Sequence, residues 1–271
     1  MSIRTLVAEA GCDRRDAEIL MLLVCGQTDR SWLYAHGDDD LHSGQAQQFS
    51  DLCDRRRAGT PIAYLLGRRE FWSFELEVTP DVLIPRPETE ILVEWAIDLI
   101  DAHALESVLD LGTGSGAIAL AIKSERPQVT VVASDRSAGA LEVARKNAAT
   151  LGLDVTFHCS DWYAQLPAMP MQSLVVSNPP YVAVGDPHLS MGDLPAEPRD
   201  ALTDHGDGFT AIGRVIEGAK GALRSGGWLL LEHGFEQAER VGSMLSDANF
   251  HSPQMRRDLA GLPRVSGGQW L

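Results

Sequence analysis

The sequence predicts an α/β fold in which a mainly parallel sheet follows a small helical bundle. From Ser107 onward, short apolar runs alternate with helical segments, the order typical of parallel βαβ units. Before residue 70, apolar residues recur at helical spacing instead. We therefore expect a helical N-terminal domain over residues 1–70, a β-hairpin linker over 71–82 and an α/β domain over 83–271.

Composition narrows the classes of function. The 271 residues are 44% hydrophobic and carry a formal net charge of −15. A nucleic-acid backbone calls for a basic surface instead, and the basic run Arg55–Arg57 is expected to be a solvated helix face. Four scattered cysteines show no metal or disulfide pattern and favour free thiols in a reducing cytosol. The apolar run Ile19–Cys25 is too short to cross a bilayer. From the charge, the cysteines and this run together, we expect a cytoplasmic protein that binds no metal, no membrane and no nucleic acid directly.

The N-terminal region shows helical periodicity but no catalytic motif. Asp13 is a plausible N-cap, and a later helix is expected over residues 43–57, ending near Gly59. This region is expected to serve packing or partner docking. Over residues 70–78 apolar and polar residues alternate at strand period, which predicts the hairpin.

A stiff loop precedes the α/β domain. Two prolines flank Arg86 within Leu83–Glu90, and Glu88 and Glu90 suit the positive N-terminal end of the helix that follows. From these residues alone, ordinary helix initiation is the interpretation.

The first βαβ unit contains a glycine turn. A strand over Ser107–Leu111 is followed by Gly112–Gly116 and a helix from Ala117, and a second strand ends at Asp135. Glycines let the backbone approach a ligand, and the helix N-terminus presents free N–H groups. An acid at the end of the second strand is where a ribose diol is held.

Two cofactors compete for this turn. A dinucleotide site has the spacing GxGxxG and holds a pyrophosphate. Here the spacing is GxGxG, and Asp110 precedes the turn. Because a carboxylate repels phosphate and attracts an ammonium, the pattern favours S-adenosylmethionine, which carries both an ammonium and a sulfonium.

The third strand, over residues 155–159, leads to Asp161 and Trp162. Asp161 would accept a hydrogen bond from an adenine amino group, and the Trp162 indole would stack on the adenine ring or pack beside it. The structural alternative is that Asp161 is only a helix N-cap and Trp162 only a half-buried packing residue.

The fourth strand, over residues 174–176, runs into Asn178-Pro179-Pro180-Tyr181. The prolines hold Asn178 extended at the strand end, where ligands bind in open α/β sheets. The Asn178 amide, the Pro179 carbonyl and the Tyr181 ring would then converge and suit a flat group that bears an NH2. For this tetrapeptide alone, a proline-rich turn at a strand end is the structural alternative.

The remaining segments complete the domain. Residues 182–208 lack a sustained period, and a loop of that length beside the site is a candidate substrate lid or docking loop. His233 beside Glu232 is interpreted as a structural histidine rather than an acid–base group. The other expected elements are helices over 208–224 and 236–247 and strands over 228–232, 254–257 and 264–266.

Together these motifs resemble a known enzyme family. DLGTGSG (Asp110–Gly116), Asp135, Asp161 with Trp162, and NPPY (Asn178–Tyr181) resemble class I S-adenosylmethionine-dependent methyltransferases that act on planar nitrogens. LIPRPETE (Leu83–Glu90), LLLEHG (Leu229–Gly234) and the helical N-terminal domain narrow the resemblance to the peptide chain release factor glutamine N5-methyltransferases. The resemblance covers nearly the whole chain. NPPY alone is shared with adenine N6 DNA methyltransferases, whereas IPRPETE is far more specific.

The resemblance implies a Rossmann-like class I methyltransferase fold with a mixed, mainly parallel sheet. It implies methyl transfer from S-adenosylmethionine to the glutamine of the Gly-Gly-Gln motif in class I release factors, which supports translation termination, with S-adenosylhomocysteine as product. It assigns to the cofactor Asp110, Gly112, Thr113, Gly114, Ser115, Gly116, Asp135, Asp161, Trp162 and Asn178. It assigns to the substrate Asn178, Pro179, Pro180 and Tyr181, bordered by Arg86, Glu88 and Thr89.

Direct in-line transfer is the mechanism that these residues suit. A carboxamide nitrogen is a poor nucleophile because its lone pair is delocalised, whereas the sulfonium methyl is already activated. The Asn178 oxygen and the Pro179 carbonyl would each accept an N–H of the glutamine, and Tyr181 would pack on the amide plane. These three residues are the catalytic candidates.

Other interpretations stay open at this point. The nearest is an adenine N6 or other nucleic-acid amino methyltransferase; a non-catalytic cofactor-binding protein and a dinucleotide-dependent reductase are the others. The match to the family weakens over residues 196–202. The tail Gly267-Gly268-Gln269 spells the motif that the family modifies, which we interpret as chance at a flexible end rather than as automethylation.

Overall fold

A computed structural model describes all 271 residues, which form two compact units. One contains Met1–Arg68 and Ser190–Ala196, and the other contains Arg69–Leu189 and Glu197–Leu271. None of the helices combines the length and the apolar composition that crossing a membrane requires.

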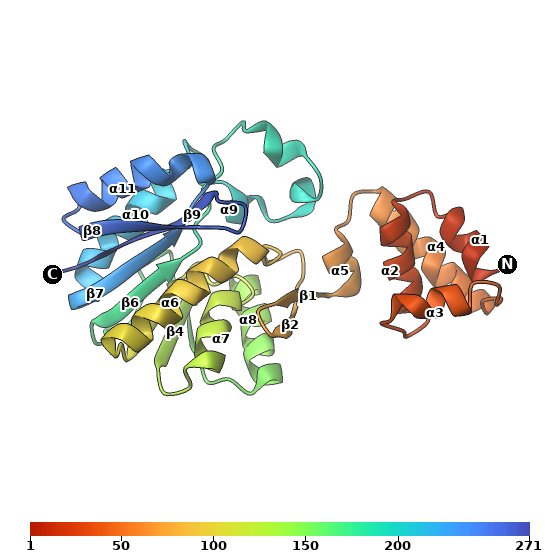
Figure 1. The fold of residues 1–271 in the computed structure, drawn as a ribbon, viewed down its shortest axis with the longest axis horizontal. Coiled ribbons are helices and arrows are strands. Elements are labelled where there is room, and N and C mark those ends of the chain that lie inside the picture. Colours follow the sequence, from red (N-terminus) through yellow and green to blue (C-terminus); the bar gives the residue numbers. More distant parts are fainter. The chain divides into compact units, whose positions relative to one another are not determined.

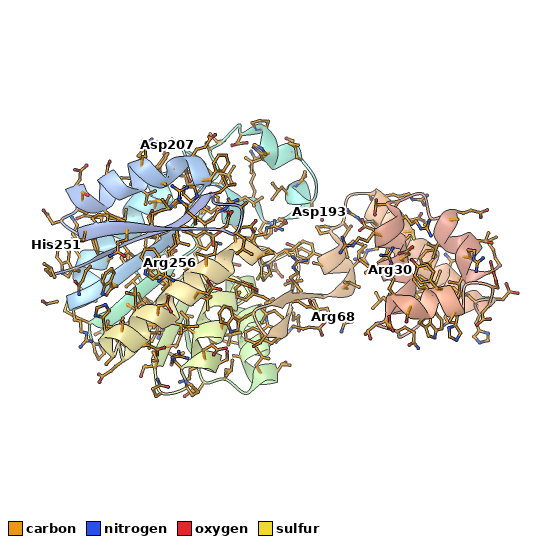
Figure 2. The ribbon with its side chains drawn as sticks, in the orientation of Figure 1. Arg30, Arg68, Asp193, Asp207, His251 and Arg256 are labelled. Carbon is orange, nitrogen blue, oxygen red and sulfur yellow. The ribbon has the colours of Figure 1, made fainter.

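The first unit is a helical bundle. Asp13 caps α2, its carboxylate accepting the Arg15 N–H at 2.8 Å, as expected from the sequence. Arg56 of α4 donates to Asp193 of the Ser190–Ala196 segment at 2.7 Å (labelled in Figure 2). The short helices α3 and α5 were not expected. The bundle consists of α1 (Ile3–Ala8), α2 (Arg14–Val24), α3 (Arg30–Ala35), α4 (Ser43–Arg57) and α5 (Ile62–Leu66).

The second unit is built on a seven-stranded sheet of order β5-β4-β3-β6-β7-β9-β8. All neighbouring strands are parallel except β9, which runs antiparallel to β7 and β8. This confirms the mixed, mainly parallel sheet. Its strands are β3 (Ser107–Leu111), β4 (Thr130–Asp135), β5 (Thr156–Cys159), β6 (Gln172–Ser177), β7 (Leu223–Glu232), β8 (His251–Arg257) and β9 (Pro263–Gln269).

Helices cover both faces of the sheet (Figure 1). Because strand side chains alternate between faces, Val108 joins the core under one helical layer while Leu109 joins the core under the other. The first layer contains α6 (Glu90–His103), α7 (Ala117–Glu125) and α8 (Ala138–Leu151), and the second contains α10 (Thr210–Ala222) and α11 (Ala238–Asp247). The guanidinium carbon of Arg256 in β8 lies 5.1 Å from the centre of the Trp95 ring of α6; Arg256 is labelled in Figure 2.

The hairpin and the connecting segments complete the chain. Strands β1 (Arg68–Phe71) and β2 (Phe74–Glu77) form a two-stranded sheet. The Asn147 side chain of α8 accepts the Glu77 N–H at 2.7 Å and so ties the hairpin to the α/β unit. Short helical turns occupy η1 (Pro87–Thr89), η2 (Pro187–Ser190), η3 (Leu194–Ala196), α9 (Arg199–Leu202) and η4 (Phe235–Gln237).

The expectation of a flexible tail is wrong. Gly267 and Gly268 lie buried within β9, between β7 and β8. A Cβ on Gly267 would stand 2.4 Å from a methyl of Leu230, and the Gln269 amide donates to the Gly226 carbonyl at 3.0 Å. Close packing between strands therefore accounts for the glycine pair.

Candidate active site

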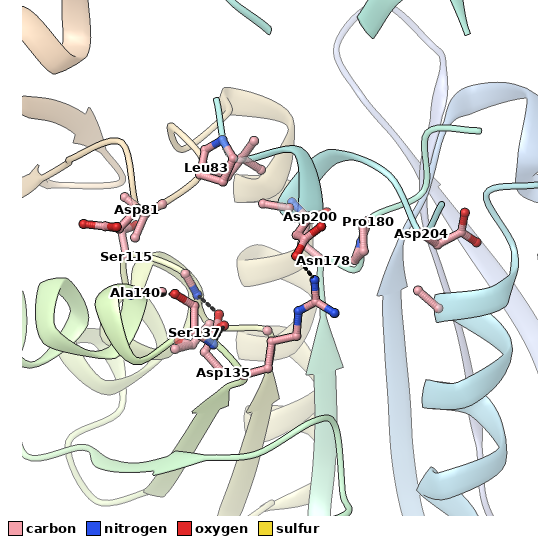
Figure 3. Close-up of a pocket in the computed structure, with 18 of the residues that line it drawn as sticks. Asp81, Leu83, Ser115, Asp135, Ser137, Ala140, Asn178, Pro180, Asp200 and Asp204 are labelled. Atoms are coloured by element: carbon pink, nitrogen blue, oxygen red, sulfur yellow. Dashed lines mark hydrogen bonds and ion pairs between the residues drawn. The ribbon is translucent and has the colours of Figure 1, made fainter. Parts of the chain in front are cut away.

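The carboxyl ends of the parallel strands open onto one cavity of about 750 Å³. Leu111 of β3 stands opposite Ser134 of β4 and Ser177 of β6, so the glycine turn, Asp135 and Asn178 leave three adjacent strands at one level. Figure 3 shows Ser115, Asp135 and Asn178 among the residues around this space.

Most, but not all, of the predicted site residues line the cavity. Those that do are Arg86, Thr89, Gly112, Thr113, Gly114, Ser115, Asp135, Asp161, Trp162, Asn178 and Pro180. Those that do not are Glu88, Asp110, Gly116, Pro179 and Tyr181.

The glycine turn is locked to the end of β4. The N–H groups of Gly112 and Thr113 both donate to the Ser134 carbonyl, at 2.8 and 2.9 Å. Gly112 and Gly114 have φ of +74° and +55°, a region that favours glycine. A Cβ on Gly114 would meet no atom within 4 Å, so the backbone here stands free beside the cavity.

Asp110 lies beneath this turn and is fully buried. One carboxylate oxygen accepts the Thr113 hydroxyl at 2.7 Å, and the other, Oδ1, has no hydrogen-bond partner. Burial raises the pKa of Asp110 to about 7, because charge is costly in a low-dielectric interior. Asp110 does not itself line the cavity, but Thr113, to which it is bonded, does.

Asp135 closes the turn from the next strand. Its Oδ2 accepts the Gly114 N–H and its Oδ1 accepts the Ser137 N–H, both at 2.9 Å. Burial raises the pKa of Asp135, and these N–H groups act in the opposite direction by favouring the carboxylate. Because each oxygen of a carboxylate offers more than one acceptor site, Asp135 can still take hydroxyl hydrogens from a ligand.

Trp162 and Asp161 form another wall. A Cβ on Gly112 would lie 3.6 Å from the Trp162 ring, so the indole stands directly beside the glycine turn. Asp161 is exposed and lies 3.9 Å from the Arg214 guanidinium. Its own N–H donates to the Gln165 side chain at 2.7 Å.

The Asn178–Tyr181 loop presents one amide to the cavity and turns its tyrosine inward. The Asn178 Nδ2 donates to the Thr89 hydroxyl at 3.3 Å. The Tyr181 hydroxyl donates to Glu232 Oε1 at 3.3 Å, and burial raises the pKa of this tyrosine. Sequence reasoning missed this contact with Glu232, although the LLLEHG motif pointed to that segment. His233 bonds to the Ser266 hydroxyl at 2.8 Å, away from the cavity, as a structural histidine does.

Several other lining residues were not predicted individually. Arg136, next to Asp135, pairs with Asp200 of α9, and His205 reaches the same carboxylate at 2.6 Å. Asp200 and His205 lie in the 182–208 segment, which its composition predicts to be a substrate lid or docking loop. The remaining unpredicted lining includes Leu83, which opens the LIPRPETE motif, and also Asp81, Ser137 and Ala140, for which the sequence offers no clear signal (Figure 3). No group of three or more His, Cys, Asp or Glu side chains is arranged to hold a metal ion.

Comparisons with known proteins match both units. The PrmC N-terminal domain model matches residues 3–67, and the methyltransferase small domain model matches residues 89–207. The fold is similar to that of a solved methyltransferase from Pyrococcus furiosus, with a TM-score of 0.54 and 16% identity over 81% of this chain and 98% of that one. The Rossmann-like methyltransferase fold is thus confirmed.

Curated relatives are far closer in sequence. The chain is 48% identical over 266 residues to the release factor glutamine methyltransferase of Bordetella pertussis, covering 98% of each chain. It is 48% identical over 270 residues to that of Burkholderia pseudomallei, covering 97% of this chain and 94% of the relative. This chain therefore belongs to the release factor glutamine methyltransferase family.

Proposed function

We propose that this protein transfers a methyl group from S-adenosylmethionine to the side-chain amide nitrogen of the glutamine in the Gly-Gly-Gln motif of class I peptide release factors. Relatives named release factor glutamine methyltransferase, matched over nearly their full length, support the reaction and the substrate. The observation that carries the chemistry is that Asn178 lines the same cavity as the glycine turn Gly112–Ser115.

The chain's own residues fit S-adenosylmethionine. The free backbone at Gly114 leaves room for a ligand, and Asp135 keeps acceptor sites for a ribose diol. The buried Asp110 lacks a compensating cation, and one of its oxygens is unpartnered. An ammonium near Thr113 would supply that charge, and we assign Asp161 and Trp162 to the adenine. When bound, S-adenosylmethionine supplies a methyl group that its sulfonium has already activated.

The amide-binding step is assigned to the Asn178–Tyr181 loop. The Asn178 oxygen and the Pro179 carbonyl each accept one N–H of the glutamine, which localises the nitrogen lone pair and orients it. Pro180 walls the cavity next to this amide. Tyr181 does not line the cavity, so we assign it to holding the loop in place through the bond of its hydroxyl to Glu232 rather than to packing on the amide plane.

No strong base is required before transfer. The nitrogen becomes acidic once it has been alkylated and then loses its proton to solvent. The protein's contribution is therefore orientation and hydrogen-bond acceptance, which position the reacting atoms rather than supply a nucleophile.

The segments around the cavity are assigned to holding the release factor. We assign release-factor docking to the N-terminal helical domain, residues 1–70, and to the 182–208 segment. Arg86, Glu88 and Thr89 border the amide pocket, with Arg86 and Thr89 lining the cavity itself. We assign the reaction to the cytoplasm, in line with the four free cysteines.

Labelled methyl transfer tests this function. Purified release factor, a version with its motif glutamine replaced, and bare DNA and RNA are each incubated with the enzyme and labelled S-adenosylmethionine. The proposal expects label on the intact release factor only. Label on nucleic acid would instead support the amino methyltransferase alternative, which the names of the relatives do not favour.

A further inference from the structure

One wall of the cavity is a short segment of the chain, residues 198–205, which we call the strap. All of its residues except Leu202 line the cavity. The strap contains α9 and belongs to the same compact unit as β4, whose end carries Asp135 and Arg136. A ligand that fills this cavity therefore lies against the strap.

The two ends of the strap are held by bonds that do not involve the end of β4. Before the first end, the completely buried side chain of Glu197 accepts the Ile84 N–H at 3.1 Å. Toward the second end, the Leu202 carbonyl accepts the Val182 N–H at 3.0 Å. These bonds keep both ends in place when the middle of the strap moves.

The middle of the strap is held by charged side chains instead. Asp200 of α9 pairs with the guanidinium of Arg136, and its Oδ1 accepts a hydrogen bond from His205 Nε2 at 2.6 Å (Asp200 is labelled in Figure 3). The bond from His205 lowers the pKa of Asp200, because a donor favours the charged carboxylate. Arg136 directly follows Asp135, so the pair joins the strap to the end of β4.

This contact is exposed and therefore easy to break. The side chains of Arg136, Asp200 and His205 are 52%, 60% and 53% exposed. An exposed ion pair contributes little to stability, because solvent and salt screen it and two long side chains must be ordered. Opening the pair would thus free the middle of the strap from β4 at little cost to the fold.

We propose that Arg136, Asp200 and His205 form a latch that holds the strap over the ribose end of the cavity and so sets how fast S-adenosylmethionine enters and S-adenosylhomocysteine leaves. His205 is a positioning residue, because it acts by holding the Asp200 carboxylate. The inference rests on the proposed function, which places the cofactor ribose at Asp135. The latch groups bond to one another, so the latch closes without a bond to the cofactor.

A latch of this kind changes rates rather than affinity. The same opening lets a ligand in and out, so a weaker latch should raise the association and dissociation rate constants by the same factor. Their ratio, the dissociation constant, should then stay the same. Loss of a side chain that bonds to the cofactor would instead raise the dissociation rate constant alone.

Three variants test the latch itself. Asp200→Asn and Arg136→Gln each remove one of its charges and should raise both rate constants about threefold to fivefold, the factor that corresponds to one exposed ion pair. Arg136→Lys keeps the positive charge and should stay near the wild-type rates. Two separate disruptions keep the test valid if one variant fails to fold.

The chain offers a matched control in the ion pair of Arg240 with Asp207. Their side chains are 57% and 55% exposed, their charged atoms lie 3.0 Å apart, and neither residue lines the cavity. Asp207→Asn should therefore leave both rate constants unchanged. Thermal unfolding confirms that each variant is folded.

The rates are measured on the full chain without release factor. Labelled S-adenosylhomocysteine chased with an unlabelled excess gives dissociation, stopped-flow tryptophan fluorescence gives association, and calorimetry gives Kd. Wild-type rate constants in both Asp200→Asn and Arg136→Gln, or an equal change in Asp207→Asn, would overturn the inference. A raised Kd with unchanged association would also overturn it, because Asp200 would then be a binding residue. A wild-type enzyme that shows the expected rates but does not methylate release factor would refute the proposed function instead.

Discussion

The Arg86 guanidinium donates to the carboxylate of Glu197, whose other oxygen accepts the Ile84 N–H at 3.1 Å. The Glu197 side chain is completely buried. The loop before α6 and the segment before α9 are therefore joined by a charge-assisted bond beside the cavity. Arg86, which the family resemblance places at the border of the amide pocket, also holds this segment in place.

Glu197→Gln should lower the free energy of unfolding by about 1–3 kcal/mol, because a glutamine NH2 must face either the Arg86 guanidinium or the Ile84 N–H. Denaturant titration measures the change. Glu142→Gln, an exposed position on α8, is the control and should be neutral. Equal stability of the two variants would contradict the role of Glu197.

Asp135→Asn should weaken S-adenosylmethionine binding while leaving kcat at saturating cofactor nearly unchanged. Asparagine has only one oxygen, so one of the bonds to Gly114 and Ser137, or one to the ribose, is lost. Isothermal calorimetry should show Kd raised about tenfold, as for one lost charge-assisted bond. Asp154→Asn, exposed after α8, should bind normally, and normal binding by Asp135→Asn as well would remove Asp135 from the cofactor site.

Asn178→Ala should lower kcat strongly and leave the affinity for S-adenosylmethionine nearly unchanged, the reverse of what is expected for Asp135→Asn. Loss of a preorganised hydrogen-bond acceptor at the reacting amide should lower kcat about 100-fold or more. Affinity for S-adenosylmethionine should change little, since the glycine turn and Asp135 remain intact. Single-turnover kinetics with release factor measure the rate, and Gln48→Ala, an exposed amide on α4, is the control. A full rate in Asn178→Ala would exclude the residue from catalysis.

Asp110 should make the stability of the ligand-free protein depend on pH. Its folded pKa of about 7 lies above the ordinary 3.8, so its contribution to stability is complete below pH 4 and is lost as pH rises through 7. The stability lost amounts to about 1.4 kcal/mol per unit of pKa shift. Asp110→Asn avoids this loss because an asparagine side chain does not ionise. The variant should therefore gain stability over the wild type between pH 5 and pH 8, and a difference that does not vary with pH would contradict a buried, titrating carboxyl. The same variant should bind S-adenosylmethionine more weakly.

Gly267→Ala should cost about 1–3 kcal/mol through overpacking, because the new methyl would stand 2.4 Å from Leu230 and 2.6 Å from the Leu229 carbonyl. Gly242→Ala in α11 meets no atom within 4 Å and should instead stabilise by about 0.5–1 kcal/mol through helix propensity. Thermal unfolding compares the two. Since β9 holds the Gln269 amide against Gly226, enzyme incubated alone with S-adenosylmethionine should gain no methyl group, and a gain of one methylene would show that this strand opens.

Local pattern was enough to predict the α/β core. Apolar runs, the Gly112–Gly116 turn and the prolines after Asn178 act over a few residues, so strands β3 to β7 and their order along the chain could be predicted. Position at the carboxyl ends of parallel strands then brought Asp135 and Asn178 to one edge.

Contacts between distant segments could not be predicted in the same way. Nothing near Glu197 indicates that its partner is Arg86, 111 residues away, and nothing near Glu232 points to Tyr181. The sequence around β9 does not show that this strand pairs between β7 and β8, because strand order in a sheet is set by how the chain folds back on itself and not by local residues. This is why the tail was expected to be flexible.

Methylation of the motif glutamine is tested most directly by locating the methyl group on the product. Release factor treated with enzyme and S-adenosylmethionine is digested, and the peptide that contains the Gly-Gly-Gln motif is fragmented in a mass spectrometer. We expect a gain of one methylene on the motif glutamine, retained in the glutamine side chain, and absent with the Asn178→Ala enzyme on the same timescale. A methyl group on any other residue, or an unmodified glutamine with active, cofactor-bound enzyme, would contradict it.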